Sequence, residues 1–228
     1  MVREGAWKVR TQRERTIRNL NMHICATWEC DGNGWPIVRP SYAVPERLVT
    51  FQVSNAKDNS DAFCHFFIDD YRFERLWTKP ERYIPILRQY AGAISPDFST
   101  YTDMPWPMQQ WNIYRSRVLM QYWQDNGIEV IPTIQWCDER TVEASIEGLP
   151  RGGSVVIGTA GIFKTQDGID LLTMGLGRIL EELEPNNVLM YGKEHQLGIE
   201  SYCNVVWYAN DNHERVVGNA GHRDRSRM

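Results

Sequence analysis

Short runs of apolar and β-branched residues recur along this chain, and segments long enough for helices separate them. The runs cover residues 48–53, 63–68, 93–94, 128–134, 154–157 and 188–191, with a further candidate at 203–208. Segments typical of helices lie at 108–125, 138–147 and 168–183, with two shorter ones between residues 73 and 90. Strands that alternate with helices predict parallel β-α units, and continuous apolar runs predict strands that are covered on both faces.

The predicted fold is α/β, a compact or incomplete (β/α) barrel-like parallel sheet with flanking helices. An open doubly wound sheet is the second alternative. A complete eight-stranded barrel typically needs about 250 residues, whereas this chain has 228 and its first strand-like run begins only at Leu48. No G-x-G-x-x-G or Walker A sequence follows a predicted strand, which argues against dinucleotide-binding and P-loop folds.

Composition divides the chain into three parts. Residues 1–46 are a polar, irregular N-terminal lead-in, rich in Arg at its start and in Gly and Pro later. Residues 47–208 are expected to form a single α/β domain, which is long enough to bury a sizeable core. Residues 209–228 are polar and are expected to be a flexible tail.

The totals limit the classes of partner. The formal net charge is −4, so the chain as a whole lacks the excess of basic residues that many DNA-binding proteins carry. Five cysteines at irregular spacing favour reduced thiols over a disulfide framework, as is typical of a cytoplasmic protein. No apolar run approaches the roughly 20 residues of a membrane span, and the N-terminus lacks an apolar signal core, so no membrane partner is expected.

Two groups of residues offer donor atoms for a metal. The segment 23–30 carries one His and two Cys, but no second pair at zinc-finger spacing follows, so no metal site is predicted there. Asp69 and Asp70 follow a predicted strand, and Asp69 together with Asp97 offers carboxylate ligands for Mg²⁺. The alternative is that one of the two neighbouring aspartates caps the next helix. The cofactor is otherwise left open.

Ligands of parallel α/β folds bind where the strands end at their carboxyl termini. This rule selects polar and aromatic residues that should meet at one rim. The residues expected to bind substrate are Asp69, Ser99, Trp136, Thr159 and Lys164. The glycine-containing turn 158–161 offers backbone amides to a phosphate beside Lys164, and the indole of Trp136 offers a surface for stacking a base.

The stretch from Gly92 to Trp136 contains the most specific site hypothesis. Asp97 follows a short strand-like run and opens a long polar and aromatic loop that reaches Pro107. A carboxylate at a strand end can act as general base, nucleophile or metal ligand. The structural alternative is that Asp97 caps a local turn by accepting hydrogen bonds from the amides of Ser99 or Thr100.

The helix predicted at 108–125 should pack through one apolar face and present polar residues beside it. The apolar face is formed by Trp111, Tyr114, Val118 and Tyr122. Asn112 and Arg115 lie on a neighbouring face near the rim of Asp97, and these three residues form the predicted catalytic group. Asn112 would orient the substrate and Arg115 would hold an anionic group. The alternative for Arg115 is a structural ion pair with Asp97.

Several segments of the chain are similar to one known family. They are HFFIDDYRFERLWTKPERYIPIL, SPDFSTYTDMPWPMQQWNIYRSR, YWQDNGIEVIPTIQW and VLMYG. Together they resemble the DUF4417 family of uncharacterised phage and mobile-element proteins, over roughly residues 48–192, with SPDFS and N-x-x-R as the most specific part. The resemblance implies a phage or mobile-element origin and the cytoplasm of an infected or host bacterial cell, but no activity. The positions that match the family pattern are Asp97, Phe98, Ser99, Asn112, Arg115 and Trp136.

Two functional hypotheses remain open. The first is an enzyme that acts on a nucleotide or nucleic-acid-derived substrate at the rim, with Asp97 as general base or nucleophile. The second is a non-catalytic binding protein that sequesters a nucleotide, single-stranded nucleic acid or a host protein, which the Arg-rich N-terminus and the many aromatic residues favour. Turnover, as opposed to stoichiometric binding without product, separates the two.

Overall fold

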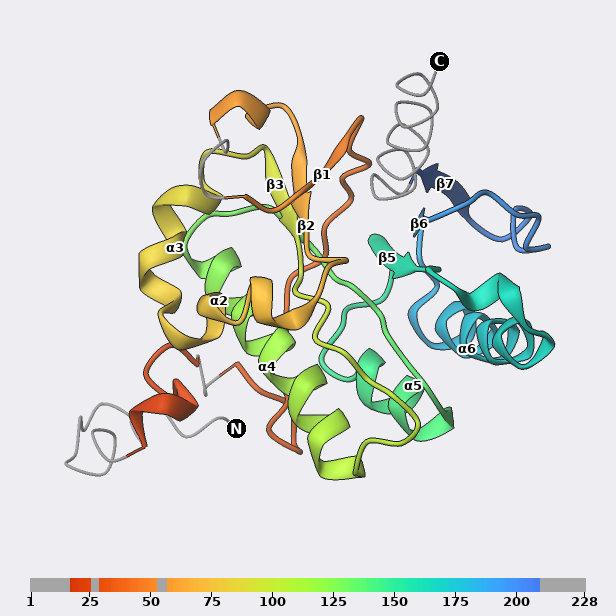
Figure 1. The fold of residues 1–228 in the computed structure, drawn as a ribbon, viewed down its shortest axis with the longest axis horizontal. Coiled ribbons are helices and arrows are strands. Elements are labelled where there is room, and N and C mark those ends of the chain that lie inside the picture. Colours follow the sequence, from red (N-terminus) through yellow and green to blue (C-terminus); the bar gives the residue numbers. More distant parts are fainter. Residues whose placement is uncertain (1–16, 26–28, 53–56, 210–228) are drawn as a thin grey trace, which may run out of the picture.

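A computed structural model of the protein describes residues 17–25, 29–52 and 57–209. Every predicted strand is present, and several are shorter than the apolar run that predicted them (Figure 1). Val53, at the end of the first predicted run, lies outside the described residues. The strands are β1 (Leu48–Thr50), β2 (Phe63–His65), β3 (Gly92–Ile94), β4 (Val130–Ile131), β5 (Ser154–Gly158), β6 (Asn187–Tyr191) and β7 (Asn204–Tyr208).

The strands lie side by side in chain order, and all neighbouring pairs are parallel. β1 to β4 form one sheet and β5 to β7 form another. The two sheets are joined just after β4, where Thr133 pairs with Val156 and the backbone N–H of Ile134 bonds to the carbonyl oxygen of Val156. This order confirms the predicted parallel α/β fold. A doubly wound sheet, whose strand order reverses, is not what the chain forms.

One shared interior cluster draws side chains from all of these strands. Its buried members are Leu48, Phe63, Ile94, Ile131, Val156, Leu189, Tyr191 and Tyr208. Because the first and last strands contribute to the same cluster, the sheet curls around it. Within the described residues β1 and β7 form no ladder, so the curled sheet is an incomplete barrel. The hydroxyl of Tyr208 donates to the carbonyl oxygen of Pro45 at 2.6 Å and ties the last strand to the segment that enters β1.

The helices connect successive strands. They are α2 (Arg75–Thr78), α3 (Pro80–Leu87), α4 (Trp106–Asp125), α5 (Glu139–Ile146) and α6 (Gln166–Leu183), with short 3-10 helices η1 (Arg18–Leu20), η2 (Lys57–Asn59), η3 (Asp70–Arg72) and η4 (Ile162–Lys164). α5 begins where the Asp138 carboxylate accepts from the backbone N–H of Thr141, 2.8 Å away. The helices predicted to begin at residues 108, 138 and 168 each begin within two residues of those positions.

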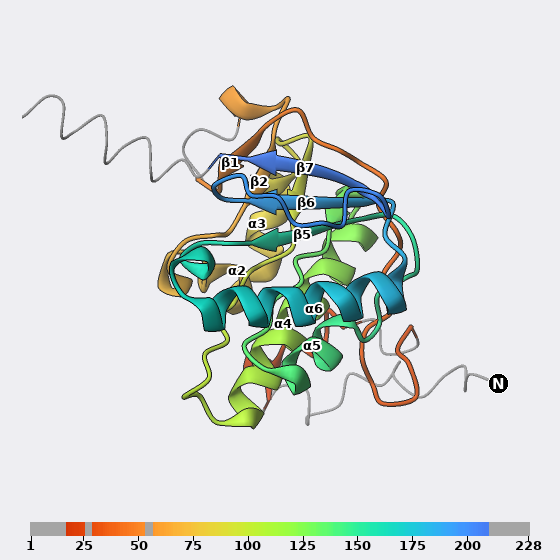
Figure 2. The ribbon, with the colours of Figure 1, turned by 90° about the vertical axis from the view of Figure 1, so that its right-hand side faces the viewer.

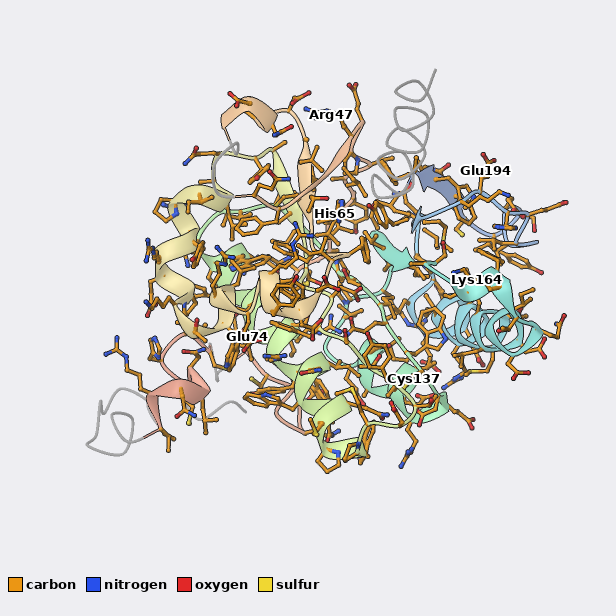
Figure 3. All side chains as sticks on the ribbon, in the orientation of Figure 1. Arg47, His65, Glu74, Cys137, Lys164 and Glu194 are labelled. Carbon is orange, nitrogen blue, oxygen red and sulfur yellow. The ribbon has the colours of Figure 1, made fainter. Side chains whose placement is uncertain are left out.

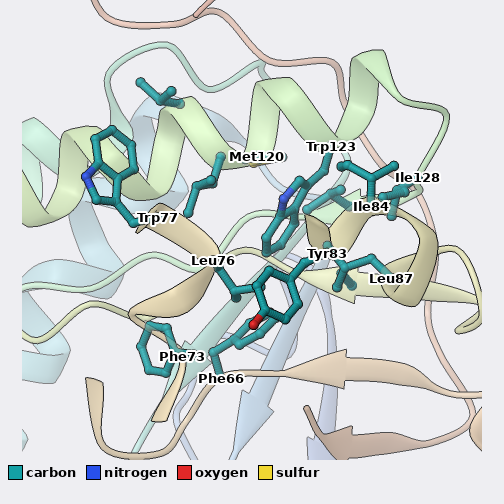
Figure 4. Close-up of a cluster of buried hydrophobic side chains, with 14 of the residues drawn as sticks. Phe66, Phe73, Leu76, Trp77, Tyr83, Ile84, Leu87, Met120, Trp123 and Ile128 are labelled. Carbon is teal, nitrogen blue, oxygen red and sulfur yellow. The ribbon is translucent and has the colours of Figure 1, made fainter. Parts of the chain in front are cut away.

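Two apolar cores hold the helices on the sheet. The larger lies between the first sheet and α2, α3 and α4, and the fully buried rings of Trp123, Phe66 and Phe73 fill it (Figure 4). The smaller lies between β5 to β7 and α6, which runs alongside β5 in Figure 2. Burial of each large apolar side chain stabilises a fold by about 1.5–3 kcal/mol, so these cores fix where α4 and α6 meet the strand ends.

Part of the N-terminal lead-in packs against this domain. Ile24 and Val38 are buried in the larger core, and the buried Trp35 packs beside α4. The predicted Arg-rich start, up to residue 16, and the predicted tail from residue 210 lie outside the described residues. Within the described part of the chain, no helix combines the length and apolar character that a membrane crossing requires.

Removal of the Tyr208 hydroxyl tests the bond that joins the two ends of the curled sheet. Tyr208→Phe leaves the ring in the interior cluster but deprives the Pro45 carbonyl of its donor, so the free energy of unfolding should fall by about 1–2 kcal/mol. Urea denaturation measures this change. Tyr202→Phe, at a ring that is 77% exposed, is the matched control and should stay within about 0.5 kcal/mol of the parent chain. Equal effects of both changes would contradict the assignment.

Candidate functional site

The carboxyl ends of the strands border a cleft that consists of two adjoining cavities of about 240 and 390 Å³. One cavity extends toward Trp136 and α6, and the other extends toward Asp69 and Tyr191. We call the two cavities together the rim cleft. Both are lined by Asp97, Ser99, Tyr101, Gly158 and Ile162.

The segment 95–99, which borders the rim cleft, has no regular secondary structure. Its carbonyl groups therefore need hydrogen-bond donors from other parts of the chain. Side chains of α4 and of the residues after β4 supply them. In chain order, the carbonyl groups of Ser95, Pro96, Phe98 and Ser99 accept hydrogen bonds from the side chains of Thr133, Ser116, Gln135 and Asn112. This set of bonds fixes the path of the segment.

Asp70 holds the same segment from the side of β2. Its carboxylate accepts from the backbone N–H of Ser99 at 3.1 Å and from the Ser99 hydroxyl at 2.8 Å. Asp69 lies at the N-cap position of η3 without a capping hydrogen bond, and it lines the rim cleft. The prediction that one of the two aspartates is the N-cap of the next helix is thus confirmed in position, but the Asp69 side chain makes no capping hydrogen bond. Asp70 anchors the loop, and Asp69 faces the cleft.

Asp97 takes part in none of these anchoring bonds. The predicted turn-capping role is wrong, because the amide of Ser99 bonds to Asp70 instead. The Asp97 carboxylate is half-buried, faces both cavities, and has no hydrogen bond or ion pair with any residue of the described part. Loss of hydration raises its pKa to about 7, and the neighbouring Asp70 carboxylate adds to the rise. Near neutral pH, Asp97 can therefore both accept and release a proton.

Arg115 is bound elsewhere. Its Nη1 donates to both carboxylate oxygens of Glu74, at 2.9 and 2.8 Å, and its guanidinium carbon lies 3.5 Å from the centre of the Phe98 ring. The predicted ion pair between Arg115 and Asp97 is therefore wrong. Neither Arg115 nor Asn112 lines the rim cleft. The geometry gives both residues a positioning role behind the segment 95–99.

The inward face of α4 differs from the predicted apolar face. Val118 is buried as expected, but Trp111, Tyr114 and Tyr122 are only partly buried. Polar residues share the buried positions with Ile113, Val118, Leu119, Met120 and Trp123, and these polar residues include Asn112, Arg115 and Ser116. Burial of these groups is tolerated because they bond to the segment 95–99 and to Glu74. Hydrophobic periodicity could not predict that the carbonyl groups of the segment 95–99 need hydrogen-bond donors from α4.

Three features of the rim cleft were missed by sequence reasoning. The exposed Arg72, from η3, lines the cleft and forms no ion pair with a residue of the described ranges. The ring of Tyr101 is 60% exposed and lines both cavities. The rings of Phe67 and Tyr191 stack at 4.7 Å and line the same cavity as Arg72. Arg72 and Phe67 both follow β2 closely, so the strand-end rule could have found them.

Trp136 lines the first cavity, and its ring is held in place. Its indole N–H donates to the carbonyl oxygen of Leu171 at 3.0 Å. The ring also lies directly against Gly175 of α6, where a Cβ atom would overlap the indole. Glycine is required at this point because the helix and the tryptophan approach so closely.

Thr159 and Lys164 line a third cavity, of about 400 Å³, rather than the rim cleft itself. We call it the lysine cavity because Lys164 and Lys193 both line it. The buried Thr159 donates through its hydroxyl to the carbonyl oxygen of Tyr191 at 3.2 Å. Ala160 lines both this cavity and the rim cleft, so the two are neighbours. The structure thus places Asp69, Asp97, Ser99 and Trp136 in one cleft, and Thr159 and Lys164 beside it.

The potential metal ligands and the thiols of the described residues are not arranged as a preformed site. They include no group of three or more His, Cys, Asp or Glu placed to hold a metal ion, and His23 instead lies 2.7 Å from Glu81. Burial raises the pKa of Cys25 and Cys137, which disfavours the reactive thiolate. None of the cysteines, which are all free, lines the rim cleft.

The close packing of Trp136 on α6 can be tested at two glycines of the same helix. Gly175→Ala should destabilise the protein by about 1–3 kcal/mol, because the new methyl group displaces the indole. Gly177→Ala is the matched control, since its added Cβ meets no atom within 4 Å. It should stabilise the helix by about 0.5–1 kcal/mol. Chemical denaturation measures both values, and stabilisation by Gly175→Ala would refute the contact.

The raised pKa of Asp97 predicts a pH-dependent cost to stability. The folded protein binds the Asp97 proton more tightly than the unfolded chain, so stability falls as pH rises from about 4 through 7. Asp97→Asn removes this loss. The free energy of unfolding of this variant should exceed that of the parent chain by an amount that grows across that window to about 2 kcal/mol above pH 7. This value is smaller than the full pKa shift of Asp97 implies, because the carboxylate is only half-buried. Asp103→Asn, at an exposed carboxylate of the same loop, is the control and should follow the parent chain.

Comparisons with known proteins identify the family. The model of the family described as "Domain of unknown function (DUF4417)" matches residues 29–209. The Gene 1 protein of Mycobacterium phage L5 is 38% identical over 161 residues, which cover 69% of this chain and 70% of that protein. The Gene 1 protein of Mycobacterium phage D29 is 38% identical over 161 residues, which cover 69% of this chain and 60% of that protein. No solved structure shows a significant match. Since the family model spans most of the chain, the protein belongs to the DUF4417 family.

Proposed function

We propose that the protein is an enzyme that binds a nucleotide or nucleic-acid-derived substrate in the rim cleft and uses Asp97 as its general base. The observation that carries this proposal is the half-buried Asp97 carboxylate, which faces the cleft and whose pKa is raised to about 7. A general base is most effective when its pKa lies near the working pH. Asp97 therefore has the property that proton transfer at neutral pH requires.

The surroundings of Asp97 support a functional role rather than a structural one. The neighbouring Ser99, Asp70 and Asn112 are joined by hydrogen bonds, whereas Asp97 contributes nothing to that network. A carboxylate that costs stability and faces a cleft is typical of active sites, where function opposes stability. The anchored backbone on both sides of Asp97 would also keep its carboxylate in a defined position when substrate binds.

The lining of the cleft favours a substrate that carries an anionic group and an aromatic base. Arg72 has no carboxylate partner within the described ranges and is free to hold an anion. The exposed ring of Tyr101 and the indole of Trp136 both face the first cavity. Aromatic side chains stack on bases with about 1–3 kcal/mol per base, and they do so without regard to base identity.

Asp69 gives the cleft a second carboxylate. In general acid–base catalysis Asp97 would accept a proton from a substrate hydroxyl, amine or bound water, and Asp69 would help to orient the group that loses it. The same two carboxylates line one cavity and are oxygen ligands of the type that Mg²⁺ prefers. A Mg²⁺ ion held by both carboxylates would be an alternative to the general-base role, because it would occupy the oxygens that would otherwise accept a proton. Turnover measured with Mg²⁺ and with EDTA separates the two.

The proposal predicts a selective loss of turnover. Purified protein is incubated with nucleosides, nucleoside mono- and triphosphates and short single-stranded DNA, and products are identified by mass spectrometry. Asp97→Asn should reduce turnover of the substrate class found by at least about 100-fold, because proton transfer typically contributes that much or more. The pH profile of kcat/KM in the parent chain should show an inflection near pH 7.

A second aspartate of the same loop provides the control. Asp103→Asn changes an exposed carboxylate of the same loop and should retain full turnover. Because Asp97→Asn is expected to stabilise the fold, lost turnover in that variant cannot come from unfolding. Full turnover by Asp97→Asn would remove the proposed role. Stoichiometric binding by the parent chain, without any product, would show a binding protein instead.

A further inference from the structure

We propose that the lysine cavity is a phosphate-binding subsite, so that the substrate of the rim cleft is a phosphorylated one. This inference rests on the proposed function for its link to catalysis, but phosphate binding itself does not depend on Asp97. The lining residues come from the two segments that follow β5 and β6. They are Thr159, Ala160, Gly161, Phe163, Lys164, Gly192, Lys193 and His195.

The charge of this cavity is positive and uncompensated. No Asp or Glu lines it. Lys164 and Lys193 form no ion pair or hydrogen bond with any side chain that the structure describes, although both are lining residues. Glu194 is adjacent to Lys193 in the chain, but it does not line the cavity and lies well apart from Lys164 (Figure 3). Two cations without a partner in one concave site suit a dianionic phosphate.

Several other surface cations of the chain form ion pairs. Arg39, Arg47, Arg140, Arg151 and Arg178 each pair with a carboxylate at 3.2 Å or less. Among the described residues, unpaired exposed cations also occur on and between the helices α2 and α3, at Arg75, Lys79 and Arg82. Lys164 and Lys193 differ from them because both line one cavity that no Asp or Glu lines. The lysine cavity neighbours the part of the rim cleft that Arg72 lines, because Ala160 lines both cavities.

The backbone around the cavity also has free donors. The amide N–H groups of Ala160, Gly161 and Lys193 make no hydrogen bond to another described residue, whereas the amides of Thr159 and Gly192 bond to neighbouring strands. Gly161 has a positive φ of 82° and nothing within 4 Å of where its Cβ would stand, so the turn is open. Consecutive backbone amides in a turn are a common way to bind anions.

His195 gives the cavity a fixed side. Its ring stacks on that of Phe163 at 3.6 Å, with 21° between the ring planes, and both residues line the cavity. Phe163 in turn lies 6.5 Å from Trp207 of β7. Packing thus holds the half-buried imidazole in one orientation. A protonated ring nitrogen that faces a bound phosphate can donate a hydrogen bond to it, and little additional side-chain entropy is lost.

A binding experiment separates this subsite from the catalytic proposal. Equilibrium dialysis compares deoxynucleoside 5′-monophosphates with the matching deoxynucleosides, at 50 and 200 mM salt. The parent chain should bind the monophosphates at least about tenfold more tightly, because charge-assisted hydrogen bonds to phosphate are strong. Lys164→Gln/Lys193→Gln should reduce the affinity for monophosphates to that for deoxynucleosides, and leave deoxynucleoside binding unchanged.

Two controls make the result specific. Lys79→Gln removes a solvent-exposed lysine that lies at the start of α3 and lines none of these cavities, and it should not alter phosphate binding. Asp97→Asn should keep its preference for monophosphates. Equal affinity of parent chain and double variant for monophosphates would overturn the subsite, as would a parent chain that binds no monophosphate at millimolar concentration. Turnover of a phosphorylated substrate at the parent rate by the double variant would overturn the subsite while leaving the role of Asp97 intact.

The phosphate could belong to a free nucleotide or to a polynucleotide backbone. The same dialysis with a single-stranded decanucleotide separates these sources. Binding of the decanucleotide that exceeds monophosphate binding and falls steeply between the two salt concentrations assigns a backbone phosphate, because several phosphate contacts release counterions together. Preference for the monophosphate with a weak salt dependence assigns a free nucleotide. Either result supports the subsite if the double variant abolishes it.

Discussion

The structure depends on how the carbonyl groups of the segment 95–99 are satisfied. This segment leaves β3 without regular secondary structure, next to the buried interior, and each unsatisfied carbonyl there would cost about 1–3 kcal/mol. Side chains of Ser116, Asn112 and Gln135 serve as donors, while Asp70 accepts from Ser99. α4 therefore buries polar residues along a face that a helix of this length would ordinarily make apolar. The loop is anchored from α4, from the end of β4 and from η3.

That anchoring leaves Asp97 as a carboxylate set apart from the network. Both of its chain neighbours are fixed, Pro96 by Ser116 and Phe98 by Gln135 and the Arg115 guanidinium. Its side chain loses hydration without gaining a partner in the described part of the chain, and its pKa rises for that reason. The hydrogen-bond network around Asp97 stabilises a loop that holds this destabilising carboxylate at the cleft, as the proton transfer proposed for it would require.

Ion pairs are distributed unevenly over the described part of the chain. Arg115 is neutralised by Glu74 behind the loop, and the helix surface of α6 pairs Arg178 with Glu143 and Glu181. Around the strand ends, Arg72, Lys164 and Lys193 line cavities without such partners. The net charge of −4 is a total over the whole chain, so it does not reveal the two lysines that line one cavity without a carboxylate.

Local patterns were enough to predict the strands, the order of β-α units, the parallel sheet and the position of Asp97 at a strand end, because hydrophobic runs and turn residues act over a few neighbours. They also identified the family through SPDFS and N-x-x-R. They could not predict that Arg115 turns to Glu74 or that Asp70 takes the amide of Ser99. Those choices pair residues 29 to 41 positions apart, and a polar group selects its partner by distance and burial in the folded chain. The sequence by itself determined the strands and the edge at which Asp97 lies. Only the tertiary structure decided that Asn112 and Arg115 lie behind the loop and that Asp97 has no partner among the described residues.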